Sequence, residues 1–514
     1  MDVKEMHGET RPTSSDDGII NASGHKQELE RNFGLLSIIG LVLTSANTWL
    51  AVGGTLTVAI YNGGAVGVIT EYITVSLIYF CIAASLAELA SAMPSAGGVY
   101  HWATITAGKW GRPVGFFAGW LNSLAWIFGL ASSLQILGLQ ITSMYALYHP
   151  EYVPERSHVL AVYLICCWML CAAVIVGNRI LPHVETLGGV LCMAGFFVSV
   201  LVCAIMPGST GGGHATATAV WKTWSNGTGW SDGLAFCLGM LNGAYAVGTP
   251  DAISKMCEEV PHPSVNIPKA MLVQYAVGFV TGITFLIAIF YGITDFDAVI
   301  ARGLNFPLAA IYEQATGSTA GAVGLIVVAF LPSFIAIIGL YLICSRAFWT
   351  LARDNATPFP STFGHVSSRF KTPANSVILC ASICTLLALI YLGNSTAFAA
   401  LIGSFVILTT ISYLLAILPH LLRKRQSVES GPFFMKGAVG YAVNIVSCLF
   451  IVVFDVLFCF PFAVPFDATT MNYASLLAGG LTVLVAGFWF WRQKGYDGPK
   501  YVPVSADNLD KDAV

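Results

Sequence analysis

Apolar runs long enough to cross a lipid bilayer recur along nearly the whole chain, and they limit its fold more than any other feature. About 20 consecutive apolar residues span ~30 Å of hydrocarbon, and this chain of 514 residues is 56% hydrophobic and only 10% charged. We therefore predict an all-α integral membrane protein with one transporter-sized domain at residues 35–492 and no soluble catalytic domain. The twelve predicted spans are centred near Leu43, Ser76, Phe128, Cys167, Gly195, Leu241, Gly282, Phe334, Cys384, Leu408, Ile451 and Val483.

Lysine and arginine are distributed unequally between the two sides of the predicted membrane. With the N-terminus in the cytosol, 21 of the 24 Lys and Arg residues fall in cytosolic segments, and Arg156, Lys222 and Arg302 fall outside. Cytosolic loops of membrane proteins carry an excess of these residues. We therefore expect a multi-pass protein with both termini cytosolic, in the plasma membrane or, alternatively, in a vacuolar or other endomembrane. The polar segments 1–34 and 493–514 are interpreted as disordered cytosolic tails, and no signal peptide is visible.

Two spans are interrupted near their middle by Gly, Pro and polar residues. Span one contains the stretch Ser45–Gly54, and span six contains Gly239–Asp251. Hydrocarbon cannot hydrogen-bond a free backbone, so unwound backbone at this depth is tolerated only where it lines a cavity or a ligand. Broken helices at matching positions in two halves indicate the substrate site of a transporter. We therefore interpret the chain as a carrier.

Unwound backbone offers N–H groups to an anion and carbonyl groups to a cation, so main chain alone could hold an amino acid or an ammonium compound. The aromatic rings of Trp49 and Tyr245 could add cation–π attraction. The alternative for the glycines is tight helix packing, and the alternative for Asp251 is capping of the following half-helix. Asn122, Trp126 and Ser333 are weaker candidates. The predicted substrate-binding residues are Ser45, Ala46, Asn47, Thr48, Trp49 and Gly53 in span one, and Asn242, Gly243, Ala244, Tyr245, Gly248 and Asp251 in span six.

Carboxylates at the cytosolic ends of the spans are expected to form salt bridges. Glu88 ends span two, and Glu258 and Glu259 close span six. Charges inside a membrane protein pair with one another, so these three should meet Lys or Arg of the cytosolic loops, as a gate or as structural pairs. We have no physical account of Asp455 in span eleven.

Several kinds of chemistry are absent from the sequence. There is no phosphate-binding GxxxxGK[ST] loop, no His pair with metal-ligand spacing, and no arrangement suited to a catalytic triad. We therefore expect neither an enzyme nor a nucleic-acid-binding protein, and no cofactor or metal. Asn226, in a glycosylation sequon of the outer loop between spans five and six, is a predicted glycosylation site.

Four motifs resemble the amino acid–polyamine–organocation superfamily, particularly its fungal amino acid/choline branch. The resemblance runs from about Phe33 to Trp491. The motifs are Ser85-Leu-Ala-Glu-Leu-Ala-Ser-Ala-Met-Pro-Ser-Ala-Gly-Gly-Val-Tyr-His-Trp102, Asp251-Ala-Ile-Ser-Lys-Met-Cys-Glu-Glu-Val-Pro261, Asn266–Ala270 and Ser345–Asp354.

The resemblance implies a five-plus-five inverted repeat, with residues 35–206 and 233–418 as the repeats and the helices of 438–491 as peripheral. It also implies alternating access and proton-coupled import of an amine or amino acid such as choline or GABA. Two departures concern gating and coupling: Lys255 stands where relatives commonly have His, and span five, Thr186–Met206, lacks the Lys of some members. The alternatives are a carrier for a specialised nitrogenous metabolite, in either direction, and a nutrient sensor.

Overall fold

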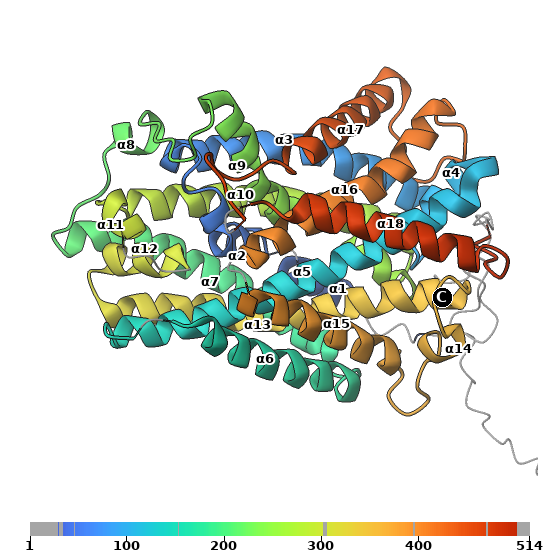
Figure 1. The fold of residues 1–514 in the computed structure, drawn as a ribbon, viewed down its shortest axis with the longest axis horizontal. Helices are drawn as coiled ribbons and strands as arrows, with labels where there is room; N and C mark the ends of the chain where they lie inside the picture. The colour runs from blue at the N-terminus through green and yellow to red at the C-terminus, as the bar shows by residue number, and fades with distance from the viewer. Residues whose placement is uncertain are drawn as a thin grey trace, which may run out of the picture.

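The computed structural model of the chain describes residues 29, 34–45, 47–152, 154–301, 306–393, 396–468 and 471–500. These residues form an all-helical bundle whose long helices run side by side along the long axis of the molecule (Figure 1). Its helices are α1 (Leu35–Ser45), α2 (Thr48–Gly54), η1 (Leu56–Val58), α3 (Gly64–Ala92), α4 (Val99–Thr106), η2 (Gly108–Trp110), α5 (Gly111–Tyr148), α6 (Arg156–Val176), α7 (Leu181–Ser209), α8 (Ala217–Trp221), α9 (Asp232–Val247), η3 (Ala252–Glu259), α10 (Pro263–Tyr291), α11 (Phe296–Ala301), α12 (Pro307–Thr316), α13 (Thr319–Arg353), α14 (Pro360–Phe363), α15 (Ala374–Gly393), α16 (Ala397–Leu422), α17 (Gly437–Leu457) and α18 (Ala474–Arg492).

The helices account for the twelve predicted crossings. Eleven helical segments among the described residues are long and apolar enough to cross a membrane. The remaining crossing, span six, consists of the short helix α9 followed by η3. The all-helical prediction is therefore confirmed, and the count of twelve agrees with the structure once the interrupted span is included.

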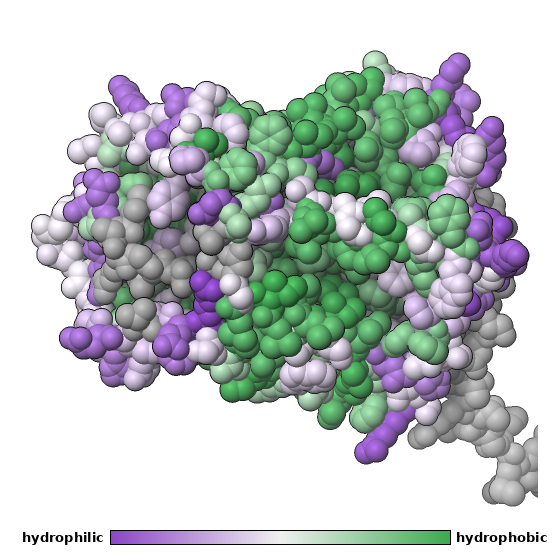
Figure 2. All heavy atoms as spheres, viewed as in Figure 1, coloured by the Kyte–Doolittle hydropathy of each residue, from purple (hydrophilic) through white to green (hydrophobic). Residues whose placement is uncertain are grey.

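The surface has the pattern expected of a protein surrounded by lipid. Figure 2 shows a hydrophobic band across the middle of one face, between two ends rich in hydrophilic residues. Large apolar side chains such as Val190 and Phe197 on α7, Val452 on α17 and Val483 on α18 are exposed. Hydrocarbon replaces water around such a band, so these side chains need no protein partner.

The central helices and the peripheral helices differ sharply in burial. α5 is buried over most of its length and packs against α13 and α16, whereas α17 and α18 are largely exposed. The two halves also contact each other reciprocally, because α3 packs against α9 while α10 packs against α2. This arrangement places the two interrupted spans at the centre of the bundle.

The start of the predicted C-terminal tail is ordered, which corrects the prediction for residues 493–500. Tyr496 is fully buried, and its hydroxyl donates to the hydroxyl of Tyr100 at 2.9 Å. The Arg112 guanidinium donates to the carbonyls of Gln493 and Tyr496. The aromatic ring of Tyr496 packs against Phe116, so one aromatic side chain of the polar tail holds this segment on the bundle.

The contact between α1 and α7 depends on two glycines. A Cβ on Gly189 would lie 2.8 Å from the Cα of Gly40, and a Cβ on Gly40 would lie 2.6 Å from the carbonyl oxygen of Glu185. Small residues let membrane helices approach closely. The side chains of Ser37 and Thr186 meet at 3.2 Å across the same seam. The backbones of α1 and α7 therefore touch along this seam.

The Gly189→Leu variant should destabilise the protein, because the added side chain has no space against α1. Overpacking of this kind costs about 1–3 kcal/mol. Gly487→Leu is the matched control, since a Cβ at Gly487 in α18 has no atom within 4 Å. The melting temperature of each purified variant in detergent tests this. Equal melting temperatures for the two variants would contradict the close packing of α1 and α7.

Candidate functional site

A cavity lies between the two interrupted spans at the centre of the bundle. It has a volume of about 60 Å³, and the break and second half-helix of span one border it together with the end of α9. Side chains of α5, α13 and α16 complete the wall, and none of the lining residues is charged. The lining residues are Asn47, Leu50, Ala51, Trp126, Gly129, Ser133, Ile136, Tyr245, Ala246, Thr249, Ser333, Ala336, Leu340 and Phe405.

The two breaks were predicted from the sequence, and the structure confirms both, with narrower limits. Span one is broken between α1 and α2, where Asn47 adopts a non-helical conformation and its side-chain amide donates to the Thr44 carbonyl at 2.7 Å. Span six is broken at Gly248–Asp251, between α9 and η3. The predicted unwinding of residues 239–247 is wrong, because these residues continue α9.

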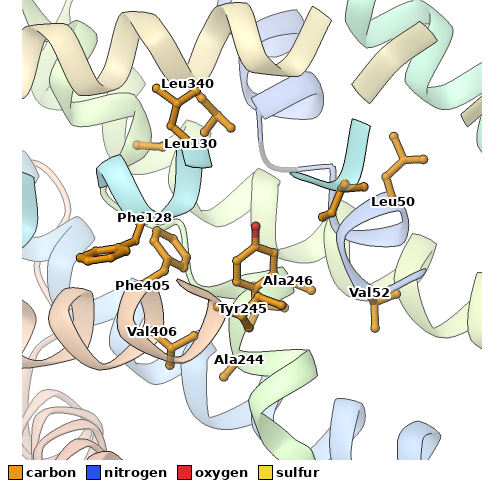
Figure 3. Close-up of a cluster of buried hydrophobic side chains, with 14 of the residues drawn as sticks. Leu50, Val52, Phe128, Leu130, Ala244, Tyr245, Ala246, Leu340, Phe405 and Val406 are labelled. Atoms are coloured by element: carbon orange, nitrogen blue, oxygen red, sulfur yellow. The ribbon is translucent and has the colours of Figure 1, made fainter. Parts of the chain in front are cut away.

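Aromatic rings from three helices meet at one side of the cavity. The ring of Phe405 lies 5.6 Å from that of Trp126 and 5.4 Å from that of Tyr245, both edge to face. Figure 3 shows Phe405 between Tyr245 on one side and Phe128 on the other. The Tyr245 hydroxyl lies 2.7 Å from that of Ser132, which fixes the direction of the ring. Such walls suit an ammonium group, which is attracted to aromatic faces.

Asp251 lies behind the aromatic wall and does not cap η3 with its side chain. Its carboxylate instead accepts hydrogen bonds from Asn122 at 3.0 Å, the Trp126 indole at 3.2 Å and the Tyr413 hydroxyl at 2.5 Å. The Lys255 ammonium lies 3.5 Å from the same carboxylate, and both groups are buried. The capping interpretation is therefore wrong: a cap would have turned the carboxylate to the backbone of η3, whereas four side chains hold it.

Several of the predicted span-one residues face away from the cavity. Trp49 points toward α7 and α10, with its ring 6.3 Å from Phe196 and 5.1 Å from Phe285. Gly53 packs against Phe285. Thr48 is buried against Gly278 of α10. Ala46 and the side chain of Ser45 lie outside the described residues, so Asn47 is the predicted span-one residue that the structure places at the cavity.

In span six, Tyr245 lines the cavity and its predicted neighbours serve the packing of α9. Gly243 lies against Tyr72 and Val75 of α3, and Ala244 is buried. Asn242 accepts a hydrogen bond from the Thr55 hydroxyl at 2.5 Å, which links the two interrupted spans directly. Gly248 is in the break, and its carbonyl accepts from Tyr413.

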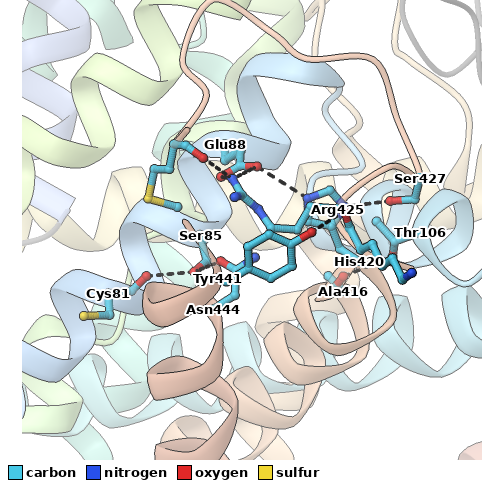
Figure 4. A network of polar contacts seen from close by, with 12 residues as sticks. Cys81, Ser85, Glu88, Thr106, Ala416, His420, Arg425, Ser427, Tyr441 and Asn444 are labelled. Carbon is cyan, nitrogen blue, oxygen red and sulfur yellow. Dashed lines mark hydrogen bonds and ion pairs between the residues drawn. The ribbon is translucent and has the colours of Figure 1, made fainter. Parts of the chain in front are cut away.

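Three buried ion pairs lie at the end of the bundle that carries α4 and α14, which we call the α14 end. Glu88 accepts from Arg425 at 2.6 and 2.7 Å and lies 3.5 Å from His420 (Figure 4). The other pairs are Glu258 with Arg353 at 2.9 Å and Glu259 with Arg346 at 3.0 Å. The predicted pairing of these three carboxylates with basic residues is confirmed. The pairs join η3 to α13, and α3 to the segment after α16.

The opposite end, which carries α8 and α11 and is called the α8 end, is hollow instead. A second cavity there has a volume of about 340 Å³ and is also free of charged residues in its wall. Residues from η1, α5, α15, α16 and the segment after α17 line it, among them Thr57, Tyr61, Leu139, Tyr391, Phe398 and Phe462. Buried ion pairs therefore lie at one end of the bundle, and the larger cavity lies at the other.

Sequence reasoning missed several of these residues for identifiable reasons. Phe405 lies in an uninterrupted apolar span, where nothing distinguishes it from lipid-facing phenylalanines. Ser133 resembles the other small polar residues of α5. Glu185 is buried in α7 with no hydrogen-bond partner for either carboxylate oxygen, and a single Glu inside an apolar span was the signal that could have revealed it. Asp455 accepts a hydrogen bond from Thr410 at 2.6 Å, which attaches α17 to α16.

Asn226 lies in the loop before α9 and is partly buried. Its amide nitrogen donates to the carbonyl of Trp230 at 2.8 Å and to Asp232 at 3.0 Å, and its oxygen accepts from Thr228. Attachment of a sugar would have to replace contacts of this nitrogen. Glycosylation of Asn226 stays a prediction.

Comparison with known proteins identifies the family. Residues 33–485 match the model of the amino acid permease family. A choline transporter of Saccharomyces cerevisiae is 31% identical over 486 residues, covering 93% of this chain and 84% of the relative. An amino-acid permease of Arabidopsis thaliana is 27% identical, covering 93% of this chain and 94% of the relative.

A solved structure shares the fold. The crystal structure of a manganese transporter from Eremococcus coleocola matches 92% of this chain and 98% of its own with a TM-score of 0.55, at 14% sequence identity. The chain therefore belongs to the amino acid permease family, within the amino acid–polyamine–organocation superfamily, and is a membrane transporter rather than an enzyme.

Proposed function

We propose that this permease imports a small organic ammonium compound, with choline as the leading substrate and GABA or another amino acid as the alternative, by proton-coupled alternating access. The observation that carries the proposal is the uncharged central cavity with Trp126, Tyr245 and Phe405 in its wall. Aromatic faces bind quaternary ammonium groups when water is excluded. The similarity to a choline transporter supports the same substrate class.

The helix ends at the cavity also favour a cation. α1 and α9 enter the bundle from opposite ends, and both stop at the breaks with their C-terminal ends near the cavity. The C-terminal end of a helix carries partial negative charge. A cationic group between these two ends would gain from both without needing a carboxylate in the wall.

The distribution of basic residues supports a cytosolic location for the α14 end. The start of α5 and the ends of α13 and α18 lie at this end (Figure 1), and the residues there include Lys109, Arg112, Arg353 and Arg492, which agrees with the positive-inside rule. The three ion pairs then form a closed cytosolic gate, and the hollow at the α8 end opens toward the outside of the plasma membrane. In this orientation substrate enters from the hollow and leaves after the ion pairs separate.

The first test separates charge from shape. Uptake of labelled choline into transporter-deficient cells should be inhibited by excess choline but not by 3,3-dimethylbutan-1-ol, in which carbon replaces the charged nitrogen. Amino acids and polyamines complete the panel. Equal inhibition by the neutral analogue would argue against recognition of the ammonium charge, and uptake of amino acids alone would support the alternative substrate.

The Phe405→Leu variant should raise the KM for choline about 10-fold or more, because a desolvated cation–π contact is worth about 2 kcal/mol. Initial uptake rates over a range of choline concentrations measure the KM. Phe128→Leu is the matched control, since Phe128 is buried beside Phe405 but does not line the cavity. An unchanged KM in Phe405→Leu would remove this ring from the site.

The Asp251–Lys255 pair connects the cavity wall to η3, so breaking it on one side should abolish uptake. Asp251→Asn leaves the Lys255 ammonium buried without its counter-charge, a change that costs about 3–5 kcal/mol for buried pairs. The double variant Asp251→Asn with Lys255→Met removes both charges and should recover much of the thermal stability. Melting temperatures and surface expression measure this recovery. A double variant as unstable as the single one would mean that the two charges do not stabilise each other.

A further inference from the structure

Glu185 is a buried carboxyl group that no described contact explains. Its side chain is fully inaccessible, and neither carboxylate oxygen accepts or donates a hydrogen bond. It belongs to the buried face of α7, together with Leu181, Gly188 and Gly189. Buried carboxyl groups are normally paired or hydrogen-bonded, because an isolated charge is strongly disfavoured away from water. In this dry environment Glu185 is stable in its neutral, protonated form.

The location of Glu185 ties it to the interrupted span. Its backbone carbonyl accepts from the Thr44 hydroxyl at 3.3 Å, in the last turn of α1, and also contacts Gly40. Thr44 in turn accepts from Asn47, which lines the central cavity. Glu185 therefore lies on the seam between α7 and the half-helix that leads to the substrate site.

The described helices that pack against α7 do not supply a counter-charge for Glu185. α1 has no titratable side chain over Leu35–Ser45. His183 of α7 and Lys269 of α10 are exposed. The other titratable groups of α7 are the neutral thiols of Cys192 and Cys203. Those on the packed elements are engaged elsewhere or lie toward the α8 end: Tyr341 with Cys167, Cys344 with the Trp126 carbonyl, Arg346 with Glu259, Arg353 with Glu258, Tyr275 with the Val247 carbonyl, Tyr291 with Trp221, and Tyr312 and Glu313 of α12.

Glu71 provides an internal comparison. Its carboxyl group is also buried without a hydrogen-bond partner, but it lies between α3 and α9, against Gly239. It does not touch α1. Two carboxyl groups of the same kind therefore occupy different seams, and of the two it is Glu185 that lies on the seam with the first half-helix of span one.

We infer that Glu185 carries the coupling proton of the transport cycle, an inference that rests on the proposed function. One proton from the outside binds the carboxylate through the cavity, forming an O–H bond, and the neutral group fits the dry seam between α1 and α7. Loss of this proton to the cytosol leaves a carboxylate that requires water. The loaded carrier, with Glu185 neutral, opens toward the cytosol, so proton and substrate leave on the same side. The empty carrier then returns with its carboxylate hydrated, ready to bind the next proton from the outside.

Proteoliposomes test this directly. Purified protein is reconstituted with a pH-sensitive dye inside, and the membrane potential is clamped at zero with valinomycin and equal potassium. Addition of external choline should acidify the lumen with the wild type. With Glu185→Gln, acidification should fall to that of protein-free liposomes, while exchange of labelled for unlabelled choline continues. Glu71→Gln is the matched control and should acidify as the wild type does.

Each outcome has a distinct meaning. Persistent acidification by Glu185→Gln overturns the assignment, and loss of both acidification and exchange in a folded Glu185→Gln protein assigns the residue to packing instead. Wild-type choline transport without acidification also overturns it but leaves the proposed substrate intact. A wild type that does not move choline overturns the proposed function itself. If Glu185→Gln fails to fold, Glu185→Asp should retain acidification with a shifted dependence on external pH, and an unshifted profile overturns the assignment.

Discussion

Peptide groups that leave a helix cannot be satisfied by hydrocarbon, and the architecture of this permease follows from that constraint. Two of its crossings contain such groups, and both are placed at the centre of the bundle, where α3, α5, α10 and α16 separate them from lipid. The hydrogen bond from Thr55, at the end of α2, to Asn242 of α9 joins the two crossings. Long, uninterrupted helices surround them. The cavity exists because the polar backbone had to be enclosed by protein.

The distribution of charge divides the molecule into an uncharged site and a charged closure. The Asp251 carboxylate accepts a hydrogen bond from the indole of Trp126 and so holds this wall of the cavity in place, while the Lys255 ammonium neutralises the carboxylate charge. Glu88, Glu258 and Glu259 are paired with arginines at the α14 end. A cationic substrate would therefore meet aromatic faces and helix ends, which attract it without holding it as tightly as a carboxylate would. Weak, distributed attraction suits a carrier that must also release its substrate.

Sequence reasoning worked where one physical rule decides the outcome. The length of the apolar runs predicted the membrane crossings, and Gly248 and Pro250 marked the break in span six. An unpaired charge inside a membrane protein is unfavourable, which predicted basic partners for Glu88, Glu258 and Glu259. It failed where the role of a residue depends on the direction in which its side chain points. Each residue of a helix points about 100° from the last, so the sequence could not show that Trp49 faces α10 while Tyr245 faces the cavity. Gly239 and Gly243 suggested unwinding, although membrane helices also use glycine for close packing against α3.

The burial of Tyr496 has a practical consequence for work on this protein. Its hydrogen bond to Tyr100 and the contacts of Arg112 fasten the end of the last crossing to the region where α4 meets α5. A truncation that removes Tyr496 would uncover an aromatic pocket at the α14 end, whereas a fluorescent protein joined after Lys500 would leave it filled. Reporter fusions should therefore keep residues 493–500, so that damage to this segment is not mistaken for a loss of transport activity.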